Sequence, residues 1–369
     1  MKADQGGLST HTASGLAKAV TTEDEGAVQN NSQADKAHAS GRGATALVDG
    51  YGRRIDYVRL SVTDRCDLRC RYCMAEQMTF VPRQQLLSFE EIDRLVDVLI
   101  ERGVRRVRLT GGEPLVRRGI ADLAAGLGAK PGLDELTMTT NATQLARHAP
   151  ALAAAGIRRI NVSLDSREPN RFRAITRRGN LTDVLAGIAA ATAAGIAIKI
   201  NMVVLAGVNH DEIEAMARWC AAEGHGLTLI EAMPLGEVAD HRGDHYLPLD
   251  AVLTDLAERI ELVPSLFRSG GPARYYDVPE IGLRLGVITP LTNNFCAGCN
   301  RIRITATGTV YGCLGHDQKV ELRDLLRHGA EAAVNEALDE LIAGKPRRHQ
   351  FDIDADRPAV ARHMSVTGG

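Results

Sequence analysis

The 369-residue sequence predicts an α/β fold, an open partial (βα)6 barrel of the TIM type followed by a C-terminal α+β extension. Six short apolar segments of strand character alternate with segments of helical periodicity, which indicates a parallel sheet with right-handed crossovers. Glycines close the Ala-rich helical segments, at Gly156, Gly195 and Gly224. Six units fall short of the eight of a closed barrel, so an open barrel is favoured.

The elements of the barrel follow in regular order. The first strand is expected at 57–62, and the sequence from Ser88 to Glu91 has the pattern of a capping box, which opens a helix that ends at Gly103. The next strand and helix are expected at 104–110 and 115–127. The other strands of the barrel are expected at 135–140, 159–164, 197–205 and 227–232.

The pattern changes beyond Pro234. The elements expected there are a helix at 247–260, interrupted strands at 273–288, a hairpin at 301–314 that turns at Gly308, and closing helices at 320–341. Residues 1–46 are small and polar and cannot bury enough apolar surface to offset the entropy lost on ordering. We therefore expect a disordered extension at 1–46, the barrel at 47–234 and the C-terminal extension at 235–369.

Composition and charge argue against several classes of protein. The formal net charge of −2 argues against a nucleic-acid partner, which would require a strong basic excess. No apolar run is long enough to span a membrane, and residues 1–46 lack the pattern of a signal peptide. Six of the seven cysteines lie in two clusters that suit metal binding in a reducing compartment. A cytoplasmic location is therefore expected.

The first cysteine group is Cys66, Cys70 and Cys73, on the loop after the first strand. Three thiolates can hold three corners of a cuboidal [4Fe–4S] cluster and leave the fourth iron without a protein ligand, open for chemistry. A structural zinc site is one alternative, although such a site usually takes four ligands. Chemically inert buried cysteines are another alternative.

Further candidate segments should lie on the same rim as this loop, because the active site of a parallel βα fold forms at the carboxyl ends of the strands. The segments at these ends are 110–114, 139–141, 163–165 and 231–234. Taken singly, each could be an ordinary turn or a helix N-cap.

The second cysteine group is Cys296, Cys299 and Cys313. It again supplies three thiolates, so a second cluster with an open iron is expected. A zinc site completed by His316 is the alternative. Cys220 lies in a helical pattern and is expected in the core.

The first cysteine loop, with Tyr72 before its last cysteine, resembles that of radical S-adenosylmethionine (SAM) enzymes, and the rim segments follow it in the order of their SAM-binding elements. The resemblance implies that the open iron binds the amino and carboxylate groups of SAM, which is then cleaved to a 5′-deoxyadenosyl radical. The residues it assigns to SAM are Tyr72, Gly112, Ser163 and Met233, with Glu113 as a supporting group.

The second cysteine group narrows this resemblance. With two groups of three cysteines, the chain from about Leu47 onward resembles the GTP 3′,8-cyclases of molybdenum cofactor biosynthesis. The sequence from Cys299 to Arg303 and the pair Gly368-Gly369 also match that family. Arginine suits a triphosphate because its guanidinium pairs with phosphate through two parallel hydrogen bonds; solvated surface charge is the alternative reading of these arginines. The GTP contacts that the resemblance implies are Arg59, Arg108, Thr139, Lys199, Arg301, Ile302 and Arg303, with guanine on the open iron of the second cluster.

The implied reaction converts GTP to (8S)-3′,8-cyclo-7,8-dihydroguanosine 5′-triphosphate, by removal of the 3′ hydrogen and addition of the carbon radical to C8. The catalytic residues are then Cys66, Cys70, Cys73, Gly368 and Gly369, the two glycines helping to hold the SAM and GTP sites in a productive geometry. The implied partners are a reductant such as flavodoxin or ferredoxin, and the cyclic pyranopterin monophosphate synthase that takes the product. The sequence leaves open whether the chain is a monomer or a homodimer.

Two other functions stay open. A radical SAM enzyme that modifies a peptide could carry auxiliary clusters, but it would not need the arginines or the Gly-Gly pair. A non-enzymatic iron–sulfur or zinc scaffold would not need the rim segments. The sequence departs from the family pattern at Ala142, at Ile302 and at 314–317, none of which is a cluster ligand.

Overall fold

A computed structural model of the chain describes residues 45–236, 242–353 and 358–368, and all structural statements below concern these residues. The predicted extension at 1–46 lies outside them except for Thr45 and Ala46, and Gly369 also lies outside them.

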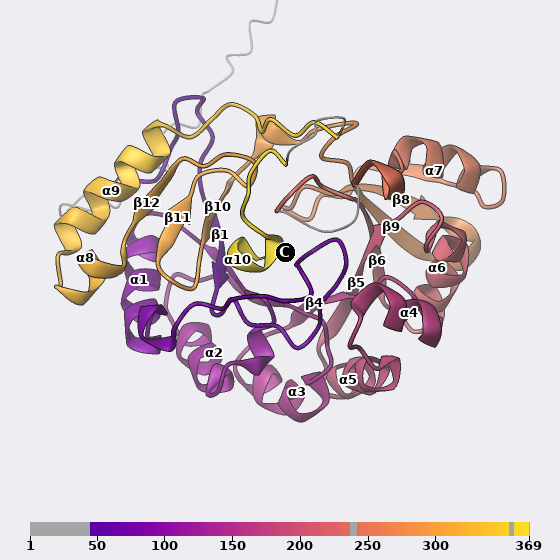
Figure 1. The fold of residues 1–369 in the computed structure, drawn as a ribbon, viewed down its shortest axis with the longest axis horizontal. Helices are drawn as coiled ribbons and strands as arrows, with labels where there is room; N and C mark the ends of the chain where they lie inside the picture. Colours follow the sequence, from indigo (N-terminus) through magenta and orange to yellow (C-terminus); the bar gives the residue numbers. More distant parts are fainter. Residues whose placement is uncertain (1–44, 237–241, 354–357, 369) are drawn as a thin grey trace, which may run out of the picture. The chain divides into compact units, whose positions relative to one another are not determined.

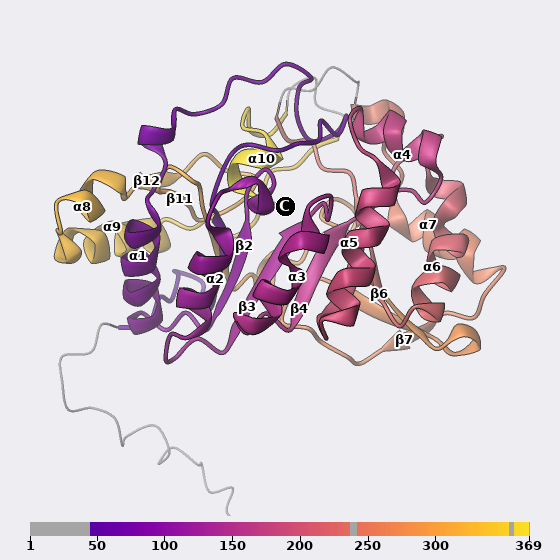
Figure 2. The same ribbon diagram turned by 90° about the horizontal axis from the view of Figure 1, so that it is seen from below.

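The described strands form one 12-stranded sheet in the order β12-β11-β10-β1-β2-β3-β4-β5-β6-β9-β8-β7. Its central six strands run parallel and in chain order, which confirms the open partial barrel. These strands are β1 (Tyr57–Ser61), β2 (Arg106–Thr110), β3 (Glu135–Thr140), β4 (Arg159–Ser163), β5 (Ala197–Val204) and β6 (Gly226–Glu231). Helices cover the outer face of the sheet (Figures 1 and 2): α1 (Phe89–Glu101), α2 (Ile120–Gly128), α3 (Leu145–Ala154), α4 (Pro169–Thr176), α5 (Leu181–Ala193) and α6 (Ile213–Ala222).

The C-terminal extension continues the sheet of the barrel at both of its edges. Strand β9 (Leu283–Ile288) pairs in parallel with β6, and β10 (Arg301–Ile304) pairs in parallel with β1. Antiparallel strands lie beyond them: β8 (Arg274–Val278) and β7 (Val263–Ser265) on one side, β11 (Thr309–Tyr311) and β12 (Lys319–Glu321) on the other. The segment 289–300 therefore connects opposite edges of the six-stranded array, and it carries Cys296 and Cys299. The predicted division at 234/235 stays a prediction.

Local signals in the sequence account for several element boundaries. The capping box is present, since Ser88 Oγ accepts a hydrogen bond from Glu91 N (3.1 Å) and Glu91 Oε2 accepts one from Ser88 N (2.6 Å). The three predicted helix-ending glycines have φ values of 86°, 79° and 68°, a left-handed conformation that favours glycine. The hairpin turns at Gly308 as predicted.

The closing helices begin later than the predicted residue 320. Val320 lies in β12, where it pairs with Val310 of β11. The contact between these two apolar side chains stabilises a strand at this position, although the local sequence has helical periodicity. The helices follow as α8 (Arg323–Arg327) and α9 (Glu331–Ala343), while α7 (Leu249–Ala257) lies within its predicted range and α10 (Met364–Thr367) is additional.

The alternation of side chains along β1 divides the core from the interior of the barrel. Val58 and Leu60 are fully buried in the hydrophobic core, whereas Tyr57 and Arg59 line a cavity inside the barrel. Cys220 is buried in the core as expected. None of the described helices is both long and apolar enough to cross a bilayer.

Candidate active site

The interior of the barrel contains a cavity of about 280 Å³. It is lined from all six central strands, from β10 and from both cysteine groups. The sequence-predicted residues that line it are Arg59, Cys66, Cys70, Tyr72, Cys73, Arg108, Gly112, Thr139, Ser163, Lys199, Met233, Cys296, Cys299, Arg301, Arg303 and Cys313. Folding thus brings residues more than 200 positions apart in the sequence to one site.

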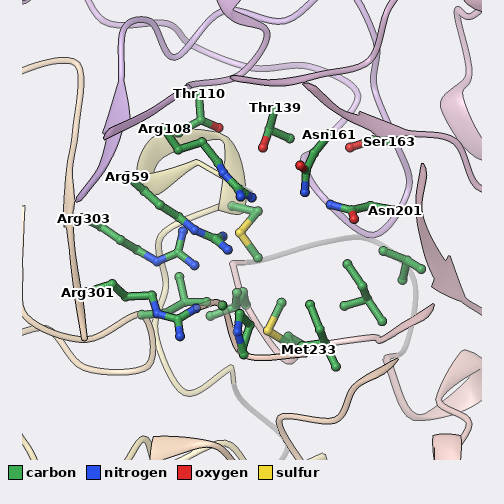
Figure 3. Close-up of a pocket in the computed structure, with 18 of the residues that line it drawn as sticks. Arg59, Arg108, Thr110, Thr139, Asn161, Ser163, Asn201, Met233, Arg301 and Arg303 are labelled. Atoms are coloured by element: carbon green, nitrogen blue, oxygen red, sulfur yellow. The ribbon is translucent and has the colours of Figure 1, made fainter. Parts of the chain in front are cut away.

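Arginines on neighbouring strands form a row across the sheet. Arg303 of β10 is the register partner of Arg59 on β1, and Arg59 is the register partner of Arg108 on β2. Figure 3 shows the side chains of these three residues and of Arg301 directed toward the same space. Like charges in adjacent register positions repel one another, so this row suits a polyanionic ligand.

Several donors in this row have no partner among the described residues. The Nε groups of Arg59 and Arg301 and the Oγ1 atom of Thr139 are buried without a hydrogen bond there. Burial lowers the pKa of Arg59 and of Arg303, and neighbouring arginines lower both further. Because unsatisfied buried donors are costly, these groups fit the oxygens of a bound phosphate chain.

Lys199 and Ile302 occupy different environments. Lys199 lines the cavity and its Nζ donates a hydrogen bond to Tyr275 Oη (2.8 Å). Ile302 is fully buried in the hydrophobic core, on the opposite side of β10 from the two arginines that flank it. A nucleotide contact from Ile302 could therefore come only from its backbone.

Sequence reasoning missed two asparagines in the cavity wall. Asn161 on β4 lies in register between Thr139 and Lys199, and Asn201 on β5 is the register partner of Ser163. Each asparagine interrupts an apolar strand and lies two residues from a predicted contact. Asn161 is two residues before Ser163, and Asn201 is two residues after Lys199. This period of two was a usable signal for side chains on the same face.

The first cysteine loop is held against the end of β2 by close backbone contact. Gly112 N donates to Thr63 O (2.7 Å) and Glu113 N donates to Arg65 O (2.7 Å). A Cβ atom on Gly112 would lie 2.3 Å from Arg65 O, so no side chain fits there. In this structure the glycine permits close approach of the cysteine loop itself, and its contact with SAM stays a prediction.

Acidic groups surround the first cysteine group. Glu113 is buried, accepts hydrogen bonds from Thr140 Oγ1 (2.7 Å), Asn141 N (2.7 Å) and Leu115 N (3.0 Å), and burial raises its pKa to about 7. Tyr72 Oη donates to Asp165 Oδ2 (2.7 Å), and burial raises the pKa of Asp165 to about 6.

Burial, together with nearby carboxylates, raises the pKa of the cysteine thiols themselves, for Cys73 to about 11. Thiols in this setting become thiolates when a cation binds them, so the donor set fits iron.

The second cysteine group lies among basic groups. Burial alone would raise the pKa of Cys299, but Lys345 and Arg301 lower it below its usual value. Arg53 donates to Cys296 O (2.8 Å) and Arg362 donates to Cys313 O (3.2 Å). An arginine thus contacts a cysteine carbonyl in both groups, since Arg69 donates to Cys66 O (2.6 Å), but the carboxylates lie at the first group and the ammonium of Lys345 lies at the second.

The zinc alternative for the second group stays open, with His316 as its fourth ligand. His316 Nε2 contacts Arg348 O at 3.0 Å. Within the described part of the chain, no three His, Cys, Asp or Glu side chains are grouped as they would be around one metal ion. A mononuclear zinc centre has such a grouping once the metal is bound, whereas a cuboidal cluster binds each cysteine at a different iron.

The segment containing α10 lies inside the curve of the sheet (Figure 1). Arg303 donates to the carbonyl groups of Thr367 (3.3 Å) and Gly368. The backbone N–H of Ser365 hydrogen-bonds to the Cys73 thiol and lowers its pKa. A Cβ atom on Gly368 would lie 2.1 Å from Thr110 Cγ2, so glycine is required at this contact. This segment therefore joins the arginine row to the first cysteine loop.

Comparisons with known proteins agree with this arrangement. Residues 60–220 match the radical SAM superfamily model, and residues 225–351 match the Molybdenum Cofactor Synthesis C model. The GTP 3′,8-cyclase of Erythrobacter litoralis (strain HTCC2594) is 55% identical over 330 residues, 88% of this chain and 99% of that protein. The GTP 3′,8-cyclase of Rhodopseudomonas palustris (strain TIE-1) is 56% identical over 88% of this chain and 96% of that protein.

Solved structures show a similar fold at low identity. The crystal structure of Streptococcus suis SuiB bound to S-adenosylmethionine has a TM-score of 0.52 and 14% identity, covering 86% of this chain and 78% of SuiB. This likeness shows the fold alone.

Proposed function

Because this chain belongs to the GTP 3′,8-cyclase family of radical SAM enzymes, we propose that its cavity holds GTP and SAM side by side, between two [4Fe–4S] clusters. The chain is a radical SAM lyase that forms (8S)-3′,8-cyclo-7,8-dihydroguanosine 5′-triphosphate from GTP, the first step of molybdenum cofactor biosynthesis. When bound, SAM and the first cluster supply the 5′-deoxyadenosyl radical that begins the reaction.

The observation that carries this function is the row of arginines that faces the first cysteine loop across one cavity. Arg59 and Arg301 offer unpaired donors, and Thr139 adds a hydroxyl. A triphosphate would satisfy these groups and neutralise the repulsion among the arginines. Asn161 and Lys199 extend the polar wall beyond Thr139.

On the SAM side, the proposed contacts are Tyr72, Gly112, Ser163 and Met233, which all line the same cavity. The hydrogen bond from Tyr72 to Asp165 fixes the ring beside the last cysteine of the loop. The chain's own contribution is to bind both ligands, to exclude water from a buried site and to fix the distance between them.

The second cluster is part of this proposal. Cys296, Cys299 and Cys313 reach the cavity from two different segments, close to Arg301. Three thiolates at one cavity wall leave an open iron for the guanine base. The charge on Lys345, beside Cys299, supports thiolate ligation there.

The wider setting of the reaction is proposed from the family. The reductant is a flavodoxin or a ferredoxin, the product passes to cyclic pyranopterin monophosphate synthase, and the reaction takes place in the cytoplasm. The fold likeness to SuiB gives no support to a peptide substrate, because that likeness shows the fold alone.

The test is anaerobic reconstitution with an iron count, followed by incubation with SAM, dithionite and GTP. We expect about eight irons per chain for two clusters, and formation of both 5′-deoxyadenosine and the cyclised nucleotide. About four irons with stoichiometric zinc would contradict the second cluster. Formation of 5′-deoxyadenosine that does not depend on GTP, with no cyclised nucleotide, would contradict the substrate.

A further inference from the structure

Lys345 follows helix α9 and is almost fully buried, with 2% of its surface exposed. Its Nζ lies 3.6 Å from Cys299 Sγ and 3.3 Å from Arg301 O, and it also donates to Gly312 O. Gly312 immediately precedes Cys313. One ammonium group therefore bridges the two segments that carry the second cysteine group.

The counter-charge for this ammonium has to come from the cysteines. Buried lysines are rare unless a negative group pairs with them, and two of the three contacts of Lys345 are neutral carbonyls. The remaining contact is Cys299 Sγ, which carries a negative charge as a thiolate. A purely structural lysine would be expected to bond a carboxylate or to extend its ammonium into water.

The two cysteine groups differ in the charge around them. Cys66 Sγ lies 3.9 Å from Asp67 Oδ1, and the buried carboxyls of Glu113 and Asp165 lie near the same group. Each group has an arginine at a cysteine carbonyl, Arg69 at Cys66 O and Arg53 at Cys296 O, but the second group also has the ammonium of Lys345 at the Cys299 sulfur. A [4Fe–4S] cluster gains one unit of negative charge when it takes up an electron, so a nearby cation favours the reduced form.

We propose that Lys345 is a positioning residue of the second cluster site, whose ammonium holds the Cys299 thiolate in place and makes the second cluster easier to reduce. This inference rests on the proposed second cluster. Lys345 is outside the predicted ligand and substrate contacts, and it acts through Cys299.

The test compares the full-length reconstituted wild type with Lys345→Met, which keeps the aliphatic stem and removes the charge, and with Lys345→Arg, which keeps the charge. Lys319→Met is the matched control, because the side chain of Lys319 is 50% exposed on β12 and pairs with Glu321. The readouts are iron per chain and a redox titration followed by electron paramagnetic resonance. Signals are assigned to each cluster with variants that lack one cysteine group.

We expect Lys345→Met to keep about eight irons and to lower the midpoint potential of the second cluster alone. A tenfold change in the reduction equilibrium corresponds to about 59 mV for one electron. Lys345→Arg should restore the potential, and Lys319→Met should leave both potentials unchanged. Loss of about four irons in Lys345→Met but not in Lys345→Arg would also support the proposal, because only the charge distinguishes them.

Unchanged potentials in Lys345→Met with full iron content would overturn the inference, as would equal loss of iron in both substitutions, which would indicate packing alone. A wild type with only about four irons would instead overturn the second cluster itself. Failure of the inference and failure of the proposed function are thus distinguishable.

Discussion

Arg59 of β1 and Arg303 of β10 are direct register partners in the parallel sheet, so two guanidinium groups lie side by side at the wall of the cavity. Arg303 is held by the carbonyl groups of Thr367 and Gly368, whereas Arg59 Nε has no partner among the described residues. The pair is therefore unfavourable in the nucleotide-free protein and becomes favourable when an anion lies between the two groups.

The first prediction concerns Arg59→Met. The free energy of unfolding of the nucleotide-free protein should rise by about 1 kcal/mol, because repulsion between adjacent strands is removed. GTP binding should weaken by roughly 1–3 kcal/mol, the range for losing a charged hydrogen bond. Urea denaturation and calorimetric titration measure the two effects. Arg94→Met on the exposed side of α1 is the control and should change neither quantity. A less stable variant with full GTP affinity would contradict the argument.

The second prediction concerns Gly112→Ala. The new Cβ atom would lie 2.3 Å from the carbonyl oxygen of Arg65, next to Cys66, and backbone on both sides cannot give way. We expect loss of the first cluster, so that iron falls by about four per chain and SAM cleavage stops. Gly298→Ala is the matched control, since a Cβ atom there meets nothing within 4 Å although it lies between Cys296 and Cys299. Retention of the first cluster in Gly112→Ala would contradict this prediction, because it would show that the loop can accommodate the added methyl group.

The third prediction concerns the pH dependence of stability at Asp165. Burial raises the pKa of Asp165 from 3.8 to about 6, so between these values the folded state keeps a proton that the unfolded state has released. Stability therefore falls as pH rises through this window, by roughly 3 kcal/mol in total for this group. The Asp165→Asn variant has no carboxyl to titrate at this position, so it does not lose stability in this way. Its amide can still accept a hydrogen bond from Val203 N and donate one to Tyr72 Oη.

The difference in free energy of unfolding between Asp165→Asn and wild type should thus grow in favour of the variant from pH 4 to 7. Urea denaturation at several pH values measures it. Glu113, whose pKa burial raises to about 7, titrates in both proteins and cancels in the difference. A difference that stays constant across this range would mean that the Asp165 carboxyl titrates normally in the folded protein.

The sequence was informative wherever a signal is local. The six parallel strands could be predicted from the alternation of strand and helix patterns, and Arg59 and Arg108 stood out as charges within apolar strands. The capping box at Ser88 and the glycine at 308 depend on the chemistry of single turns, and both were found as predicted.

The remaining features depend on contacts between distant segments. Nothing in the residues of β9 or β10 indicates that they pair with β6 and β1, because strand partners are chosen by packing of the whole sheet. Lys345 follows a helix and reads as a solvated charge, and only the folded chain brings it to Cys299. The core position of Ile302, in contrast, follows from the alternation of side chains along β10, which places it opposite to Arg301 and Arg303.

The fourth prediction concerns Cys313→Ala. Iron should fall from about eight to about four per chain, and SAM binding should persist, because the first cysteine group lies on a separate loop. GTP cyclisation should be lost, since the base would have no iron to bind. Iron analysis, SAM binding and product assay measure these effects. Cys220→Ala, which changes a cysteine of the core, is the control and should keep all iron. Full iron content in Cys313→Ala would remove this residue from the ligand set.

The last prediction concerns Gly368→Ala. The added Cβ atom would lie 2.1 Å from Thr110 Cγ2 and 2.7 Å from Thr110 Oγ1, so the segment after α10 has to move. That movement withdraws the Gly368 carbonyl from Arg303, whose guanidinium then loses its fixed direction in the arginine row. Both clusters should stay intact, while the rate of cyclisation falls by about 100-fold, as expected for a displacement on the order of 1 Å in the reacting geometry.

Single-turnover product formation with saturating GTP and SAM measures this loss. Gly282→Ala separates backbone strain from the clash, because Gly282 has φ of +67° but open space around a Cβ atom, and it should keep the wild-type rate. Thr110→Gly combined with Gly368→Ala removes the three atoms in conflict and should restore part of the rate. If Gly368→Ala alone turns over GTP at the wild-type rate, the contact between this segment and Arg303 has no part in positioning the nucleotide.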